Sequence, residues 1–298
     1  MDFYEKIVKS KQRAEMKSSN FDYITSVDTS PIEKIHLKFC KFVLSVGKSS
    51  VNIAARAEIG SYPIETYIHC QAVKYLARIS KLDNNPLLCD AFSLSKSLHS
   101  NGCYSGYSFI NNVCLNNGIN VNEVENSDYF KNKIQFSRRI KEKIRNKYQS
   151  NFFEKLNNMK EDNKLFLYSK LKKEYKIEPY IKNCKNLDER KLICKMRTSD
   201  HFLEIERGRY KNIERKKRFC TFCHDKLDDE IHFFLHCKTN NLLRPDFINN
   251  CRKYCKNFDQ LGDWDKVISI LHIEKIVQLA GPFIKKSWSL RKEDTVTA

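Results

Sequence analysis

Residues 30–47 read SPIEKIHLKFCKFVLSVG and carry the signals of an amphipathic helix with defined ends. Ser30 can cap the helix, Pro31 suits its first position, and Glu33 completes a capping box. Gly47 is expected to end the helix. Apolar side chains recur at helical spacing and predict one core-facing stripe, which comprises Ile32, Ile35, Phe39, Phe42, Val43 and Val46.

Similar patterns follow along the chain. Short helices are expected at 51–59, 63–82, 86–99 and 109–115, so that 30–120 would form one compact bundle. Further helices are expected at 163–183, ending at Pro179, and at 187–197, and a helix over 264–290 should kink at Gly281-Pro282. With Gly 8 and Pro 6 in 298 residues, the composition argues against a loop-rich β protein.

The chain is strongly basic, with Lys+Arg 54 against Asp+Glu 36 and a net charge of +18. Such a surplus favours a polyanionic partner, since each phosphate contact releases counterions. Residues 131–147 predict a long helix with one cationic face, which either binds nucleic acid or is simply a solvated charged face. Its apolar stripe would be Phe130, Ile134, Ile140, Ile144, Tyr148, Phe152 and Leu156. The nucleic-acid-binding candidates on it are Arg138, Arg139, Lys141, Lys143 and Arg145.

Residues 219–237, FCTFCHDKLDDEIHFFLHC, contain the sharpest motif, Cys220-x2-Cys223-x8-His232-x4-Cys237. A Cys-x2-Cys step lets a tight turn direct two thiolates at one ion about 2.3 Å away, and His232 and Cys237 supply two further corners of a tetrahedron. Three thiolates and one imidazole suit a single structural Zn²⁺ with no open position for a catalytic water.

Other interpretations of this segment stay open. His224 or His236 could replace His232, although His236 adjoins Cys237 and would have to bend back sharply. A redox Cys-x-x-Cys is expected near a βαβ pattern, which the sequence lacks, and plain buried cysteines are the simplest alternative. Cys251 and Cys255 lie on one helical face without a neighbouring His and are expected in the core.

Basic residues precede the motif, and the aromatic residues Tyr210, Phe219 and Phe222 are interleaved with them. Cations with exposed aromatics suit backbone phosphates and stacking on unpaired bases, whereas the same aromatics could instead pack around the metal. These nucleic-acid-binding candidates are Arg197, Arg207, Arg209, Lys211, Arg215, Lys216, Lys217 and Arg218.

The run MRTSDHFLEIERGRY at 196–210, with the Cys/His motif and Leu243-Arg244, resembles the C-terminal region of non-LTR retrotransposon reverse transcriptases. Residues 31–41 and the Gly60-Ser61-Tyr62-Pro63 segment look like the region just after the polymerase core of that family, and 1–29 depart from its pattern. The resemblance implies a thumb-like bundle, a helical linker and a zinc knuckle that grips RNA or DNA. It places the metal ligands at Cys220, Cys223, His232 and Cys237.

The sequence lacks the residues for catalysis. A polymerase palm needs an aromatic-x-Asp-Asp turn for two Mg²⁺ ions, whereas the sole Asp-Asp, Asp228-Asp229, lies between metal ligands. His99, His201 and His272 have no evident partner in the sequence, and no endonuclease is expected. We therefore expect no enzymatic activity, although the resembling family consists of RNA-directed DNA polymerases.

The predicted fold is mainly α, with a small irregular zinc module. Its expected parts are a basic arm (1–29), a thumb-like bundle (30–120), a basic helical linker (121–198), the zinc module (199–245) and C-terminal helices (246–298). We expect a zinc-stabilised, non-catalytic RNA- or DNA-binding portion of a reverse transcriptase-like protein, with a separate reverse transcriptase chain as a further partner. The alternative is a protein-interaction scaffold stapled by zinc, which would dock partners through an exposed apolar helix at 264–288.

The sequence also predicts where the protein resides. The first thirty residues contain no apolar segment typical of a secretory signal, and no run of 18 apolar residues predicts a membrane span. Twelve cysteines are too few for a disulfide scaffold. An intracellular protein without membrane contact is expected, and the basic run 215–218 favours the nucleus over the cytoplasm.

Overall fold

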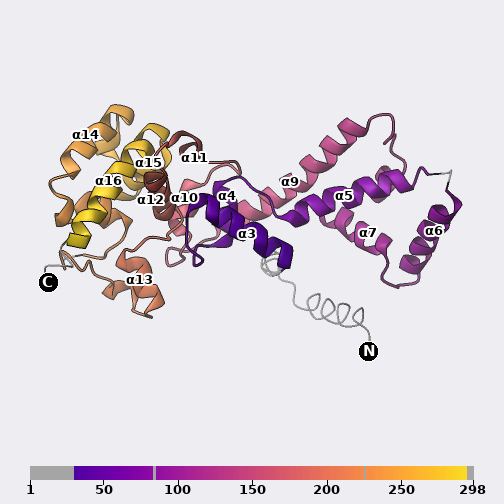
Figure 1. Cartoon of the computed structure of the whole chain (residues 1–298), viewed down its shortest axis with the longest axis horizontal. Coiled ribbons are helices and arrows are strands. Elements are labelled where there is room, and N and C mark those ends of the chain that lie inside the picture. The colour runs from indigo at the N-terminus through magenta and orange to yellow at the C-terminus, as the bar shows by residue number, and fades with distance from the viewer. Residues whose placement is uncertain (1–29, 83–84, 225, 294–298) are drawn as a thin grey trace. The chain divides into compact units, whose positions relative to one another are not determined.

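The computed structural model describes residues 30–82, 85–224 and 226–293, and within these the chain is mainly α, as predicted. The described residues contain two isolated antiparallel β-bridges, which join Ile59 to Ile177 and Phe219 to Leu227. The chain divides into two compact units (Figure 1). Unit 1 takes the residues up to His36 and Tyr62–Glu154, and unit 2 takes Leu37–Ser61 and the residues from Lys155 onward. These units do not coincide with the five predicted segments, and the predicted arm at 1–29 lies outside the described residues.

Unit 1 is built from short helices whose starts follow from their capping residues. Its helices are α5 (Ile64–Ile79), α6 (Pro86–Ser100), α7 (Gly106–Asn116), α8 (Val121–Glu125) and most of α9 (Lys133–Asn157). Asn85 accepts the Leu88 N–H at 3.2 Å with Pro86 at the first helical position, and Ser105 forms a capping box with Ser108. The core of the unit lies between α5, α7 and α9, around Val73, Leu76 and Val113.

The predicted core stripe of α9 is wrong at its beginning. Phe130 and Ile134 are exposed (58% and 86%), whereas Phe136 is buried with Ile140 and Ile144. The ring of Phe136 packs edge-on against buried Tyr129 at 5.4 Å, so the core-facing stripe runs at intervals of four from Phe136. Further along the helix, Phe152 and Leu156 are buried as predicted.

Unit 2 is organised around its last helix, α16 (Glu274–Glu293), on which α12 (Leu187–Arg197), α14 (Arg244–Tyr254) and α15 (Asp263–His272) pack (Figure 1). Gly281 makes the contact with α12 possible, since a Cβ there would lie 2.8 Å from Glu189 Cβ. The remaining helices are α4 (Asn52–Glu58), α10 (Phe166–Leu171), α11 (Pro179–Asn183) and α13 (Glu204–Tyr210). Short turns lie at η1 (Arg215–Lys217), η2 (His232–His236), η3 (Lys238–Asn240) and η4 (Phe258–Gln260).

Two predicted helix boundaries in unit 2 are wrong. The expected helix at 163–183 is two helices, because Lys172–Glu178 are not helical and Ile177 pairs with Ile59; Pro179 starts α11 instead of ending a helix. The expected helix over 264–290 is also two helices, because the break between α15 and α16 falls at Ile273, whereas α16 continues through Gly281-Pro282.

The break at Ile273 divides the apolar segment 264–288 into two helices bent by 97° that pack into the core of unit 2, instead of one exposed docking helix. Val267, Ile270, Ile276 and Ile284 are fully buried in the core of unit 2. Among the described residues no single helix is long and apolar enough to cross a membrane. Helices α15 and α16 reach the necessary length and apolar character only when taken together, and they are bent by 97° relative to each other. The segment therefore offers no free apolar surface for the predicted scaffold function.

Helix α3 (Pro31–Leu44) starts as predicted but presents its predicted core stripe to solvent. The Glu33 N–H donates to Ser30 Oγ at 3.1 Å, which confirms the cap. The large side chains of the stripe are exposed, namely Ile32, Ile35, Phe39 and Phe42, and the buried face is instead Glu33, Leu37, Cys40 and Leu44. Buried Glu33 accepts the Ile64 N–H at 2.8 Å. A carboxylate is therefore buried at a position that the periodicity of the sequence predicts to be exposed. The helix ends at Leu44 with Ser45 in the left-handed region (φ 54), whereas Gly47 donates to Asp200 at 2.9 Å.

Candidate metal centre and the basic surface around it

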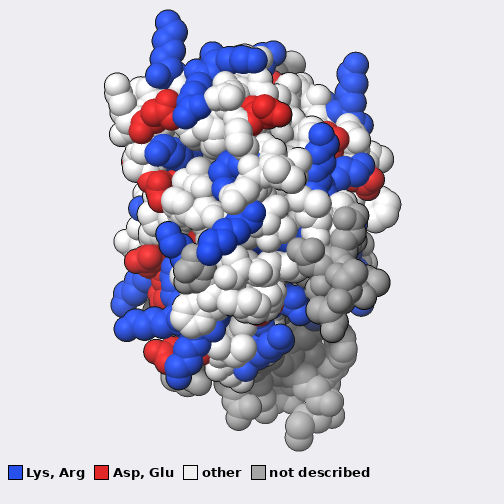
Figure 2. All heavy atoms as spheres, turned by 90° about the vertical axis from the view of Figure 1, so that its left-hand side faces the viewer, with Lys and Arg blue, Asp and Glu red and all other residues white. Residues whose placement is uncertain are grey.

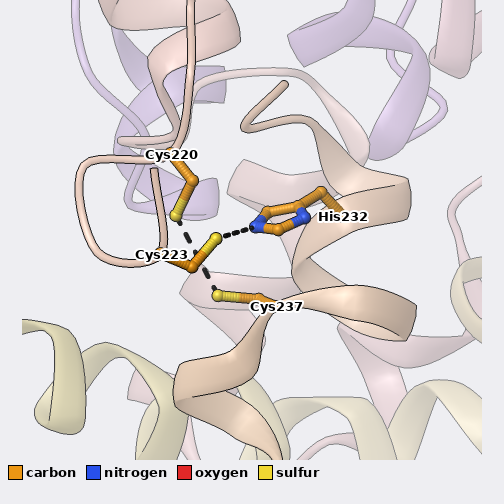
Figure 3. Close-up of side chains that lie close together, drawn as sticks. All are labelled: Cys220, Cys223, His232 and Cys237. Atoms are coloured by element: carbon orange, nitrogen blue, oxygen red, sulfur yellow. Dashed lines mark hydrogen bonds between the residues drawn. The ribbon is translucent and has the colours of Figure 1, made fainter. Parts of the chain in front are cut away.

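Cys220 and Cys223 lie on a tight loop that a short backbone pairing closes. Phe219 bridges Leu227, Cys220 N–H donates to the Lys226 carbonyl at 2.9 Å, and His224 N–H donates to the Cys220 carbonyl at 2.9 Å. His224 takes up a left-handed conformation (φ 54), which lets the chain reverse just after Cys223. The loop therefore directs both thiols to the same side (Figure 3).

His232 and Cys237 come from a π-helical turn, His232–His236. The Cys237 N–H donates to the His232 carbonyl at 2.7 Å, the i to i+5 bond of that conformation. In an ordinary α-helix, residues five apart point in different directions, whereas the wider turn brings them to one side. Asp229 starts the turn by accepting the His232 N–H at 2.8 Å. The π-helical turn thus explains how two ligands separated by four residues, His232 and Cys237, reach the same side of the chain.

The four side chains meet in one cluster with the geometry of a metal site. Cys220 Sγ lies 4.0 Å from Cys237 Sγ, and Cys223 Sγ lies 3.2 Å from His232 Nε2 (Figure 3). All four ligand atoms lie within 4.8 Å of one another, and Cys220, His232 and Cys237 are buried. Metal–sulfur bonds of about 2.3 Å put tetrahedral ligands just under 4 Å apart. Cys220, Cys223, His232 and Cys237 could therefore hold one metal ion.

The structure also shows that the alternative ligands His224 and His236 lie outside the cluster. His236 is exposed and pairs with Asp263 at 2.6 Å, and His224 is exposed on the loop. Cys251, on α14, is buried in the core of unit 2, as expected. Asp228, the first residue of the Asp-Asp pair, is buried and accepts the Glu204 N–H at 3.0 Å. Both carboxylates position backbone of the metal module, since Asp229 accepts the His232 N–H at 2.8 Å.

Arg291 from α16 brings a positive charge to the sulfur atoms. Its Nη2 lies 3.3 Å from Cys237 Sγ and 3.8 Å from Cys220 Sγ, and it pairs with Asp228 Oδ1 at 3.0 Å. The hydrogen bond from Cys220, together with His232 and Arg291, lowers the pKa of Cys237. A bound dication with three thiolates would leave one net negative charge, and the Arg291 guanidinium, which lies between that charge and the Asp228 carboxylate, would offset part of both. Sequence reasoning missed this residue because it lies 54 positions after Cys237.

A second buried pair supports the metal module and was also missed. His201 Nε2 lies 3.0 Å from Glu230 Oε1, and both side chains are almost fully buried. The Leu203 N–H points to His201 Nδ1 at 3.4 Å, which assigns the ring proton to Nε2. The interaction with His201 holds the pKa of Glu230 below its usual value against the effect of burial. No sequence spacing joins these residues, which are 29 positions apart.

Arg197 does not belong to an exposed binding surface, contrary to the prediction. It is 1% exposed and pairs with Glu58 at 3.1 Å and Glu178 at 2.9 Å. Lys172, also buried, pairs with Glu178 at 2.6 Å, and the Tyr180 hydroxyl donates to Glu58 at 2.5 Å. The guanidinium thus neutralises buried carboxylates. Sequence reasoning misplaced it because its partners lie on α4 and in the segment before α11.

The other candidates near the metal differ in how free they are. Arg218 donates to the carbonyls of Ile205 (2.7 Å) and Ile213 (2.9 Å) and covers Gly208, so it holds the backbone of α13. Arg209 and Arg215 are half-buried and donate to carbonyls at Asp162 and Glu161. The exposed cations of the set are Arg207, Lys211, Lys216 and Lys217, of which Arg207 pairs with Glu204 at 3.2 Å and Lys217 with Glu214 at 3.4 Å.

Exposed aromatic rings accompany these exposed cations. Tyr210 is 63% exposed with Lys164 Nζ 5.4 Å from its ring centre, and Phe219, next to Cys220, is 50% exposed. Phe222 instead packs under Arg291 at 5.1 Å, beside the metal ligands. On the face drawn in Figure 2, Lys and Arg side chains are spread widely, with acidic side chains among them. We name Arg207, Tyr210, Lys211, Lys216, Lys217 and Phe219 the knuckle surface.

The candidates on α9, in unit 1, are mostly solvent-facing. Arg138, Arg139, Lys141 and Lys143 are exposed, and Arg138 pairs with Glu142 at 2.9 Å. Arg145 is half-buried and stacks over Tyr62 at 4.5 Å, so it has a packing role. The helix therefore presents four of its five predicted cations to solvent.

Comparison of the chain with protein-family models, with curated proteins and with solved structures gave no match. The function is therefore inferred from the geometry and chemistry of the site.

Proposed function

We propose that the protein is a zinc-stabilised nucleic-acid-binding module without catalytic activity of its own, the C-terminal portion of a retroelement reverse transcriptase-like protein. The observation that carries this proposal is the knuckle surface, where exposed cations and aromatic rings lie in the chain segment that leads into the Cys₃His cluster.

Zinc is the ion that the donor set favours. Thiolates with one imidazole in a tetrahedral arrangement are typical of structural zinc sites, and hard cations prefer oxygen ligands. The four protein ligands complete the coordination, so the metal would stabilise the loop and the π-helical turn rather than activate water. Cys220, Cys223 and Cys237 would bind as thiolates, and His232 through Nε2.

The knuckle surface suits single-stranded nucleic acid. Lysines contact phosphates without base preference, and exposed rings such as Tyr210 and Phe219 stack on unpaired bases. The exposed cations of α9 would add a second phosphate-binding region. The net charge of +18 supports the same class of partner.

The resemblance of residues 196–210 and the Cys/His motif supports the retroelement assignment. Most of that run is structural here, because Met196, Ser199, His201, Leu203 and Ile205 are all buried. A separate reverse transcriptase chain would be a further partner, since the described residues include no cluster of carboxylates suited to two Mg²⁺ ions.

The test is a salt titration of binding to a single-stranded RNA, a hairpin RNA and a DNA duplex, with the zinc-loaded full chain. We expect steep salt dependence and a preference for single strands. The double variant Lys211→Glu/Lys216→Glu is expected to weaken binding at least about tenfold and to lower the salt slope by about 1.5. The control Lys182→Glu/Lys185→Glu changes the charge equally at exposed positions of unit 2 outside the knuckle surface.

Each outcome bears on a specific part of the proposal. Equal losses in both double variants would move the phosphate contacts away from the knuckle surface. A further loss in Arg139→Glu/Lys143→Glu would assign part of them to α9. Absence of binding near 0.1 M salt, where non-specific affinities of about 10⁻⁴–10⁻⁶ M are expected, would refute nucleic-acid binding and favour the zinc-stapled scaffold.

A further inference from the structure

Helix α6 of unit 1 is the least covered long helix among the described residues. It has 15 residues and none is buried. One side contacts α7: Phe92 packs edge-on against Tyr107 at 6.0 Å, and Ser95 Oγ accepts the Tyr107 N–H at 3.0 Å. Lys96 on the same side pairs with Glu125 at 2.7 Å. Within the described part of the chain, the opposite side of α6 has no ring contact, side-chain hydrogen bond or ion pair of this kind.

That opposite side carries a row of apolar residues, Leu87, Ala91, Leu94 and Leu98, which we name the α6 seam. Leu87 is 78% exposed and Leu94 62%, and Ala91 is also exposed. Their spacing of four, three and four residues is that of the core positions of a coiled coil. A seam of this kind buries apolar area only when a second helix covers it.

The charge pattern indicates which partner this side can accept. Residues 85–120 contain only Asp90 and Lys96 as charged residues, apart from His99, so this stretch has no net charge in a chain of +18. A polyanion has nothing to bind here, and two copies of the chain repel each other least at this surface. The exposed apolar stripe of α3 differs, because the exposed lysines Lys34 and Lys38 flank it.

We propose that α6 is a self-association surface that pairs antiparallel with α6 of a second copy across a two-fold axis. The α6 seam is complementary to itself in this orientation, because Leu87 then lies opposite Leu98 of the second copy and Ala91 opposite Leu94 of the second copy. Asp90 comes near Ser97 of the second copy, so no like charges meet. The proposal is independent of the proposed nucleic-acid binding.

The size of the contact predicts its strength. A helix of 15 residues is about 22 Å long. One helix pair buries less than the roughly 1,600 Å² of a standard interface, so the dimer is reversible and concentration-dependent. The pairing would place two nucleic-acid-binding chains in one particle, and their avidity would exceed that of either chain alone.

The test is sedimentation velocity of the full chain between about 1 and 100 µM, in about 0.5 M salt so that no bound polyanion bridges two copies. A monomer–dimer equilibrium is expected. Leu94→Glu should weaken it at least about tenfold, because a carboxylate then faces Ala91 of the second copy in a desolvated contact. The matched control is Leu115→Glu, since Leu115 is 65% exposed on α7 outside the α6 seam. This variant should leave the equilibrium unchanged.

A mixture of two variants checks the geometry. Leu94→Glu and Ala91→Lys should each self-associate weakly, and their equimolar mixture should associate at least about tenfold more tightly, since position 94 faces position 91 only in the antiparallel pair. Far-ultraviolet circular dichroism confirms that the variants remain folded. A monomer at every concentration, equal losses in Leu94→Glu and Leu115→Glu, or rescue of Leu94→Glu by Leu94→Lys instead of Ala91→Lys would overturn the proposal.

Discussion

Glu58 and Arg197 form an ion pair that solvent does not reach. Their side chains are 0% and 1% exposed, and Glu178 and Lys172 extend the pair into a cluster of alternating charge. Burial alone would raise the pKa of Glu58, but the charges of Arg197 and Lys172 outweigh it and hold that pKa below its usual value. Each member therefore depends on the others, because a buried charge without its partner costs several kcal/mol.

Glu58→Gln is expected to destabilise the protein by about 3 kcal/mol at neutral pH, because it leaves Arg197 with one carboxylate fewer. The folded pKa of Glu58 lies below its unfolded value, so this contribution is complete above pH 4.5 and disappears as the pH falls through the folded pKa. Urea unfolding of both proteins from about pH 7 to 3 measures the difference. The control is Glu174→Gln, an exposed carboxyl near Glu178. A difference that stays constant on acidification would contradict the assigned pKa.

At the scale of elements, the approach of α12 to α16 depends on the missing side chain at Gly281. A Cβ would lie 2.8 Å from Glu189 Cβ and 3.3 Å from Ile193 Cδ1, and a Cβ atom cannot swing away as the end of a long side chain can. Gly281→Ala is therefore expected to destabilise unit 2 by about 1–2 kcal/mol, although alanine favours a helix by about 1 kcal/mol.

Gly106→Ala is the matched control for this prediction. Gly106 is the first residue of α7, and its nearest neighbour to a Cβ is Ser95 Oγ at 3.8 Å. This variant should be neutral or slightly stabilising. Followed by circular dichroism, the urea midpoint of Gly281→Ala should fall, whereas that of Gly106→Ala should stay the same or rise slightly. A stabilised Gly281→Ala would show that α16 moves away from α12 at little cost.

The starts of α3 and α6 could be predicted from the sequence, whereas the buried faces of helices often could not. Ser30 and Asn85 cap helices through their own side chains, so the signal is local. The face of α3 depends on partners distant in sequence: Glu33 is buried because it accepts the Ile64 N–H, and the larger apolar stripe is left exposed. The break at Ile273 had the same origin, since the residues around it pack into a core that periodicity along one segment does not reveal.

The metal ligands were predictable for a similar reason, since all four lie within 18 residues and their spacing is tied to one loop and one turn. The residues that surround them were not. Arg291 and Arg197 lie on other helices and His201 lies between α12 and α13, and their partners are 19 to 139 positions away. A local motif thus predicts a ligand set, whereas its electrostatic environment depends on tertiary packing.

At the scale of the whole molecule, the metal centre lies within unit 2 alone. Its ligands come from the loop and the π-helical turn, and Arg291 ties them to α16, on which α12, α14 and α15 pack. Phe233 and Phe234, inside the π-helical turn, belong to the core of unit 2. Unit 1 has its own core between α5, α7 and α9. Metal loss should therefore affect the two units unequally.

Removal of the metal from the full chain with a chelator is expected to raise amide exchange first at 219–237 and next along α16, because three thiolates and Arg291 lose their common counter-charge. The amides of α5 and α7 in unit 1 should keep their protection. Hydrogen exchange followed by mass spectrometry of peptides measures both, and Cys237→Ser should reproduce the chelated pattern without chelator. The control is Cys251→Ser, which changes a buried thiol of unit 2 outside the cluster. Unchanged exchange at 219–237 after metal loss would show that backbone pairing alone holds the loop, and equal loss of protection in both units would show that they unfold together.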